Sequence, residues 1–282
     1  MRIGLGLPTA QSPPTGRLPI DWAVAAEERG FSSVAVIDRM VAPTYDPLTA
    51  LAAAAAVTGR VRLLTAVLLS PLRTAAQLAS QAATVDQLSG GRLDIGLGVG
   101  SRREDHAAAG VAFERRGRIL DAQLAEIRAT WDDCADFAAV GPAPATPEGP
   151  ALLIGGTSAA AVRRVVGSGD GWICGRGGAV EFARTATEVC RAWDEAGRPG
   201  RPRLLSVVTC AVGPDATADR DRHVGTYYRD AAFLPSLMRT TPVSVDGVRR
   251  ALDEHRAAGC DEVVLLPCSA DPRQVDHLAE LL

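Results

Sequence analysis

Short apolar runs alternate with longer amphipathic segments along almost the whole chain. The apolar runs are rich in valine and leucine, as expected for strands buried on both faces of a parallel sheet. The pattern predicts strands in residues 2–8, 33–37, 61–71, 93–101, 152–154, 172–174, 204–212 and 262–266. A helical segment or a long insertion follows each of them.

The segments between the strands have the apolar spacing of helices. Helices are predicted in residues 21–29, 46–59, 72–88, 114–131, 159–167, 180–196 and 244–258, with a closing helix after Asp271. Asp46 followed by Pro47 is a typical helix start, and Gly90 follows a helix where a left-handed residue is needed. Residues 215–241 are helical but irregular, and residues 132–150 are predicted to form a loop with at most a vestigial hairpin.

Strict alternation of strand and helix indicates a parallel sheet with right-handed crossovers. Eight such units favour an α/β fold closed into a (β/α)8 TIM barrel, and the length suits a single domain over residues 1–282. The alternative is an open doubly wound sheet. That fold favours a GxGxxG motif after the first strand, which this sequence lacks.

Composition argues against several classes of function. The net charge is −3 and aromatic residues make up 4% of the chain, so no basic, aromatic-lined stripe predicts nucleic-acid binding. The six cysteines show no CxxC pair and no histidine at zinc spacing, which predicts reduced thiols, no metal and a cytoplasmic protein. No charged, apolar leader is recognised, and the longest apolar run, residues 50–57, is too short to span a membrane.

The active site of a parallel barrel lies at the carboxyl ends of its strands, so the residues there are the candidates. These ends contain no histidine, no pair of carboxylates, no serine–histidine combination and no cluster of metal ligands. A hydrolase or a metalloenzyme would show more. The sequence therefore predicts that a cofactor supplies the reactivity and that the protein binds and orients it.

Glycines occupy one face of two predicted strands. Gly96, Gly98 and Gly100 alternate with apolar residues in the fourth strand, and Gly4 and Gly6 do so in the first. Backbone without side chains allows a close approach, so the two strands together predict a slot for a flat ring. The alternative is that the glycines only relieve crowding inside a small barrel.

The turn Gly155-Gly156-Thr157-Ser158 leads from the fifth strand into a helix. Free N–H groups, hydroxyls and the positive end of the helix dipole suit a phosphate, and phosphate sites recur in the later loops of barrels. Arg176, at the end of the next strand, is placed to add a charge-assisted contact. The alternatives are an ordinary turn with a serine cap and a surface arginine.

Two carboxylates are candidates for proton transfer. Asp38 ends the second strand, and Glu104 follows the fourth strand together with Asp105 and His106. A carboxylate held near a buried ring can donate or accept a proton. The alternatives are that Asp38 caps the loop after it and that residues 104–106 form a solvated charged loop.

Several short motifs follow one another in a fixed order. They are Asp46-Pro47-Leu48, residues 60–63, Thr65-Ala66-Val67-Leu68 with Ser70-Pro71, Ser89-Gly90-Gly91-Arg92 before residues 96–100, residues 153–156 with Ser158, and residues 169–172. Together they resemble the bacterial luciferase-like superfamily of flavin and deazaflavin oxidoreductases. The likeness covers nearly all of the chain and is weakest in residues 132–150 and 213–241.

The resemblance implies a (β/α)8 barrel with an isoalloxazine or deazaflavin ring in its mouth, over a bulge in the third strand. It implies a non-proline cis peptide at Ala66-Val67 that supports the ring. It also implies cofactor contacts from Gly98, Gly100 and Ser101, and a cofactor phosphate at the turn from Gly155 to Ser158 near Arg176.

Members of the superfamily that use coenzyme F420 often carry Asp-His after the second strand, where this chain has Asp38-Arg39. Asp38 carries over and the histidine does not. Arg39 favours an anionic group on the substrate or on the reduced ring.

These observations predict an oxidoreductase that transfers hydride between coenzyme F420 and a small organic substrate. One alternative is an FMN-dependent luciferase-like monooxygenase supplied by a separate flavin reductase. Another is a non-catalytic barrel homologue that acts as a binding subunit. The resemblance also implies a homodimer.

Overall fold

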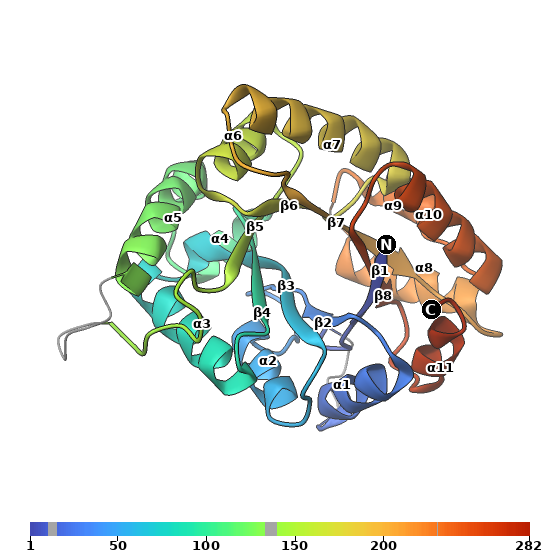
Figure 1. Ribbon diagram of the computed structural model, residues 1–282. Coiled ribbons are helices and arrows are strands. Elements are labelled where there is room, and N and C mark those ends of the chain that lie inside the picture. The colour runs from blue at the N-terminus through green and yellow to red at the C-terminus, as the bar shows by residue number, and fades with distance from the viewer. Residues whose placement is uncertain (11–15, 133–139, 230) are drawn as a thin grey trace.

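Eight parallel strands close into a barrel, and helices surround it (Figure 1). The computed structural model describes residues 1–10, 16–132, 140–229 and 231–282. The strands are β1 (Arg2–Gly6), β2 (Ser33–Val36), β3 (Arg62–Leu69), β4 (Leu93–Gly98), β5 (Ala151–Gly155), β6 (Gly171–Cys174), β7 (Arg203–Cys210) and β8 (Glu262–Pro267). Each strand pairs with its neighbours in chain order, and β8 closes the barrel against β1. The predicted fold class is confirmed.

The helices follow the predicted segments except in two places. They are α1 (Leu18–Arg29), α2 (Pro47–Ala55), α3 (Ala75–Ser89), α4 (Arg103–Ala108), α5 (Arg116–Asp132), α6 (Ala159–Ser168), α7 (Gly178–Glu195), α8 (Ala216–Tyr227), α9 (Leu234–Thr240), α10 (Val245–Ala257) and α11 (Arg273–Ala279), with 3-10 turns η1 (Ser70–Leu72) and η2 (Phe113–Arg115). The sequence did not predict α4, because six residues are too few to show a helical period. The irregular segment 215–241 contains two helices, α8 and α9.

The predicted loop of residues 132–150 lies partly outside the described residues. Its described part after α5, residues 140–150, contains no strand. The vestigial hairpin is therefore not found in that part, and residues 133–139 cannot be compared with the prediction.

Capping side chains mark the start of α2, α3, α6 and α10. Asp46 accepts a hydrogen bond from the Thr49 N–H group at 2.9 Å and Pro47 occupies the first turn of α2, as predicted. Thr74 and Gln77 form a capping box at the start of α3. That helix ends at Gly90, which has a φ of 66°, confirming the predicted left-handed residue.

Apolar side chains fill the barrel on both sides of its wall. A large cluster lies between the strands and the surrounding helices, and it includes Leu93, Ile95 and Leu97 of β4. The barrel interior holds a smaller layer made of one residue from each of six strands: Ala35, Leu64, Leu153, Ile173, Leu205 and Val264. Alternation along β4 therefore turns its glycine face toward the barrel interior.

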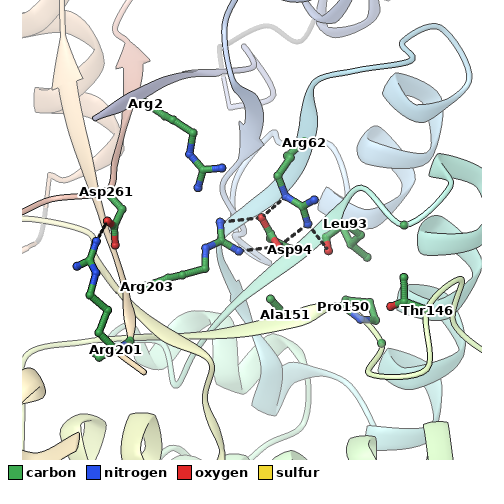
Figure 2. Close-up of a pocket in the computed structure, with 13 residues that line it drawn as sticks. Arg2, Arg62, Leu93, Asp94, Thr146, Pro150, Ala151, Arg201, Arg203 and Asp261 are labelled. Atoms are coloured by element: carbon green, nitrogen blue, oxygen red, sulfur yellow. Dashed lines mark hydrogen bonds and ion pairs between the residues drawn. The ribbon is translucent and has the colours of Figure 1, made fainter. Parts of the chain in front are cut away.

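Charged side chains line the amino-terminal end of the barrel (Figure 2). Asp94 is 2% exposed, and its two oxygens accept hydrogen bonds from Arg62 at 2.7 Å and from Arg203 at 2.9 and 3.0 Å. Burial raises the pKa of Asp94, but these hydrogen bonds outweigh burial and hold the pKa below its usual value. A cavity of about 660 Å³ opens here.

The arginines that line this cavity are all paired with buried or half-buried carboxylates. Besides Arg62 and Arg203, Arg2 pairs with Glu262 at 3.2 Å, and Arg201 pairs with Asp261. The charged network therefore stabilises the amino-terminal end of the barrel rather than presenting free cations to a ligand.

We expect Asp94→Asn to lower the free energy of unfolding by about 2–3 kcal/mol, because it leaves two partly buried guanidinium groups without their shared carboxylate. Urea unfolding at pH 7 measures this loss. Asp253→Asn, which breaks an exposed pair with Arg256 on α10, is the matched control and should change stability by less than about 0.5 kcal/mol. Equal effects of the two substitutions would contradict a structural role for the Asp94 network.

Candidate cofactor and substrate site

A cavity of about 260 Å³ lies at the carboxyl ends of the strands, where a barrel places its chemistry. Of the twelve predicted site residues, ten line it. They are Asp38, Ala66, Val67, Gly98, Gly100, Ser101, Gly155, Gly156, Thr157 and Arg176. Ser158 and Glu104 are not part of this lining.

The floor of the cavity is an irregular segment of β3. The pairing of β3 with β4 shifts register between Thr65 and Leu68, and the Ala66–Val67 peptide is cis. The Thr65 hydroxyl donates a hydrogen bond to the Gly96 carbonyl at 2.8 Å, which ties the bulge to β4. The bulge and the cis peptide implied by the resemblance are confirmed.

The glycines of β4 make room for this bulge. The sequence had predicted instead that they leave an open slot. A Cβ on Gly96 would collide with the Thr65 carbonyl oxygen, and a Cβ on Gly98 would lie 2.7 Å from Cγ2 of Val67. A Cβ on Gly155 would lie 3.0 Å from the other Val67 methyl group. The volume beside these glycines is therefore filled by the bulge and the Val67 side chain. Gly98, Gly100 and Gly155 still line the cavity with backbone alone.

The glycines of β1 have a different role, and the predicted slot shared with β4 was wrong. β2 and β3 separate β1 from β4 in the barrel. A Cβ on Gly4 would meet the Ser33 hydroxyl, and one on Gly6 would meet the Leu266 side chain. For β1 the alternative reading, relief of crowding in the barrel interior, is the correct one.

The turn after β5 presents backbone at the start of α6. Gly156 has a φ of +113°, which favours glycine, and its carbonyl accepts a hydrogen bond from the Trp172 indole at 2.7 Å. The Ser158 hydroxyl caps α6 by accepting from the Ala161 N–H group, as in the alternative reading. The Ser158 O–H group remains a free donor after this contact, but of the two hydroxyl residues of the turn only Thr157 lines the cavity.

Arg176 brings a cation to the same side of the cavity. Its guanidinium carbon lies 4.5 Å from the centre of the Phe233 ring. Within the described ranges no carboxylate forms an ion pair with it. Glu181, which interacts with Thr157, is paired with Arg184 at 2.7 Å instead. Arg176 is therefore available to an anion.

Asp38 holds the end of β3 in place. One of its oxygens accepts from the Leu69 N–H group at 2.8 Å and from Arg73 at 2.7 Å. These partners lie on β3 and just after η1, so Asp38 does not cap its own loop. Its contact with reacting atoms stays a prediction.

Arg39 is not a free cation, contrary to the expectation that it attracts an anion. It donates to the Asp105 carboxylate at 2.8 Å and lies 3.5 Å from Glu104. Asp105 also accepts from the N–H groups of Met40 and Val41. Asp105 and His106 are 1% and 0% exposed, so only Glu104 fits the solvated loop that was the alternative reading for residues 104–106.

Sequence reasoning missed the aromatic and cationic residues that cover the cavity. Tyr227 and Tyr228, at the end of α8, lie in its wall together with Arg102. Burial raises the pKa of Tyr228 to about 12 and also raises that of Tyr227, so both hydroxyls stay protonated. Two of the chain's three tyrosines are adjacent here, a signal that could have been found in an aromatic-poor sequence.

A second, wider cavity of about 850 Å³ adjoins the first. The two cavities share Arg39, Arg102 and Tyr227. The wider one is also bordered by Cys268, a thiol whose pKa burial raises to about 12, so it is not a thiolate nucleophile at neutral pH.

The parts of the chain that the structure describes contain no cluster of metal ligands and no membrane-spanning helix. There, no group of three His, Cys, Asp or Glu side chains is arranged to hold a metal ion. The five described cysteines form no disulfide. None of the described helices has both the length and the apolar character that crossing a bilayer requires.

The fold and the site together define a barrel oxidoreductase of the flavin and deazaflavin class. The family model described as luciferase-like monooxygenase matches residues 1–262, and the chain belongs to this family. An uncharacterised protein of Mycobacterium tuberculosis is 31% identical over 212 residues, which cover 72% of this chain and 74% of that protein.

Two solved structures show the same fold at low identity. An F420-dependent secondary alcohol dehydrogenase in complex with an F420-acetone adduct has a TM-score of 0.83 at 17% identity, covering 100% of this chain and 98% of that chain. The oxygenating constituent of 3,6-diketocamphane monooxygenase from Pseudomonas putida, in complex with FMN, has a TM-score of 0.76 at 16% identity. It covers 99% of this chain and 96% of that chain.

We expect Gly98→Ala to destabilise the protein by about 1–3 kcal/mol, because the new methyl group overlaps the Val67 side chain. Val67→Ala removes the overlapping atoms. The double variant should therefore lose less unfolding free energy than the two single variants together, by about 1 kcal/mol or more. Chemical unfolding of the four proteins measures this coupling. Gly167→Ala, with no atom near its new methyl group, is the control and should not couple to Val67→Ala.

We expect the free energy of unfolding to fall as the pH is lowered, because of His223 at the edge of the wider cavity. Burial, aided by the charge of Arg222, lowers its pKa to about 4 in the folded protein. The unfolded chain therefore binds the proton more readily between about pH 6.5 and pH 4, and unfolding becomes more favourable as pH falls through that range. From pH 7 to pH 5 the loss should be about 2 kcal/mol for this group. Urea unfolding of His223→Gln should show a correspondingly weaker pH dependence, and an unchanged slope would contradict the assignment.

Proposed function

We propose that this protein is an oxidoreductase that binds coenzyme F420 and transfers hydride between it and a small organic substrate. The cofactor binds in the cavity of about 260 Å³ at the carboxyl ends of the strands, here called the narrow cavity. The observation that carries the proposal is the bulged segment Ala66-Val67 of β3, which lines the same cavity as the Gly155-Gly156-Thr157 turn before α6. The family and the described neighbours support the class of cofactor.

The lining fits a planar ring with a phosphate-bearing tail. Ala66 and Val67 offer a supporting surface, and Gly98, Gly100 and Gly155 present only backbone at its borders. The amino terminus of α6 has N–H groups without partners in its own helix, next to Gly156 and Thr157. Arg176 supplies a cation on the same side.

When bound, coenzyme F420 supplies the hydride chemistry. The protein's own contribution is placement and exclusion of water. Asp38 and Arg73 fix the end of the bulged strand, so the supporting surface keeps its shape. Tyr227 and Tyr228 cover the cavity from α8. Of the two predicted catalytic carboxylates, Glu104 is the one exposed to solvent, beside Arg39.

Fluorescence titration of the purified protein with coenzyme F420 and with FMN tests the proposal. Preferential binding of coenzyme F420 is expected. Preferential binding of FMN would favour the monooxygenase alternative with a separate flavin reductase. Binding of neither ring would favour the non-catalytic alternative, and both of these results would overturn the proposal.

We expect Arg176→Gln to weaken binding of coenzyme F420 by about tenfold or more, because a charge-assisted contact to the phosphate is lost. The same variant should bind the phosphate-free deazaflavin as the wild type does. Arg191→Gln, which breaks an exposed pair on α7, is the control and should leave both affinities unchanged. Equal losses for the two ligands in Arg176→Gln would argue for a general packing defect.

A further inference from the structure

The wider cavity is bordered by arginines that no carboxylate of the described residues neutralises. Four arginines border it (Arg39, Arg102, Arg222 and Arg229), against a single lining carboxylate, Glu104. Arg39 is paired with Asp105 and Glu104, and Arg222 is paired with Asp219. Arg102 and Arg229 form no ion pair with a carboxylate of the described residues, and of these two Arg102 is half-buried whereas Arg229 is exposed.

Aromatic contacts hold the Arg102 guanidinium at the junction of the two cavities. Its carbon lies 5.3 Å from the ring centre of Tyr227 and 5.7 Å from that of Tyr228. One of its nitrogens donates to the Tyr227 carbonyl, which leaves donors on the other side of the planar group. A half-buried guanidinium gains most from a carboxylate, because the planar fork binds both oxygens.

The carboxylates near Arg102 in sequence are already used. Asp105 binds Arg39 and two backbone N–H groups, and Glu104 faces Arg39. Neither of these carboxylates is left to pair with Arg102, so an external anion remains as its counterion. Arg102 borders both cavities, so an anion bound to it lies next to the narrow cavity, where the deazaflavin ring is proposed to bind.

One segment of the wall is suited to an apolar body. Val41, Ala42 and Pro43 border the wider cavity, and Val41 is 45% exposed. Burial keeps His223 uncharged at neutral pH by lowering its pKa to about 4, so it adds no cation to this wall. A volume of about 850 Å³ suits a small organic molecule.

We infer that the substrate is an organic carboxylate with an apolar body, whose carboxylate binds Arg102 and whose body lies against residues 41–43. This inference rests on the proposed function, because it names the substrate class of the same site. Arg102 acts here as a specificity-determining residue that orients the substrate over the ring site.

Hexanoate and its neutral analogue hexanamide are matched probes. Isothermal titration calorimetry of wild-type protein, with and without bound coenzyme F420, should show hexanoate binding about tenfold more tightly than hexanamide. Arg102→Gln should lose this preference. Arg103→Gln is the control, because the adjacent Arg103 is 71% exposed and pairs with Glu114 instead, and it should keep the preference.

The outcomes separate this inference from the proposed function. Equal binding of hexanoate and hexanamide, or an unchanged preference in a folded Arg102→Gln variant, would overturn the inference even if coenzyme F420 binds. Displacement of hexanoate by coenzyme F420 would also overturn it, because the anion would then occupy the cofactor site. Hexanoate preference without cofactor binding would retain the carboxylate site and overturn the proposed function.

If Arg102→Gln does not fold, Arg102→Lys decides the question. It keeps the charge and loses the planar fork, so it should still prefer hexanoate, with severalfold lower affinity. A crystal structure with hexanoate provides an independent test. The carboxylate at Arg102 would support the inference, and the carboxylate at another arginine would overturn it.

Discussion

The packing of Val67 against backbone without side chains determines the shape of the barrel mouth. Gly98 lies on β4 and Gly155 on β5. A Cβ atom added at either position would press against the Val67 side chain. Gly96 allows the backbone of Thr65 to approach β4. These contacts let β3 bulge into the barrel without disrupting its closure. The surface that the bulge presents is the floor of the site.

Charge pairing then decides which cations at the mouth are free to bind ligands. Asp38 neutralises Arg73, and Asp105 neutralises Arg39, so both pairs organise loops around the floor. Arg176 and Arg102 instead lie against aromatic rings of the segment from α8 to α9. Among the described residues, the narrow cavity therefore has one guanidinium without a carboxylate partner on the side of α6 and another on the side of the wider cavity. They suit a phosphate and a substrate anion respectively.

Much of this arrangement could be predicted from sequence because it depends on local signals. The alternation of strands and helices, the Asp46 cap and the left-handed Gly90 are each specified by residues close together in the chain. The cis peptide at Ala66-Val67 followed from motif resemblance rather than from local chemistry. Ten predicted site residues line one cavity, because strand ends in a parallel barrel converge.

The sequence by itself determined the order of the elements, the barrel and which residues stand at the strand ends, since these depend on periodicity and on capping. Only the tertiary structure decided what each glycine face meets, because the Val67 side chain comes from another strand. It also decided which arginines are neutralised, since Arg39 and Asp105 are 66 residues apart in the chain. Contacts between distant segments are set by three-dimensional packing, which no local pattern encodes.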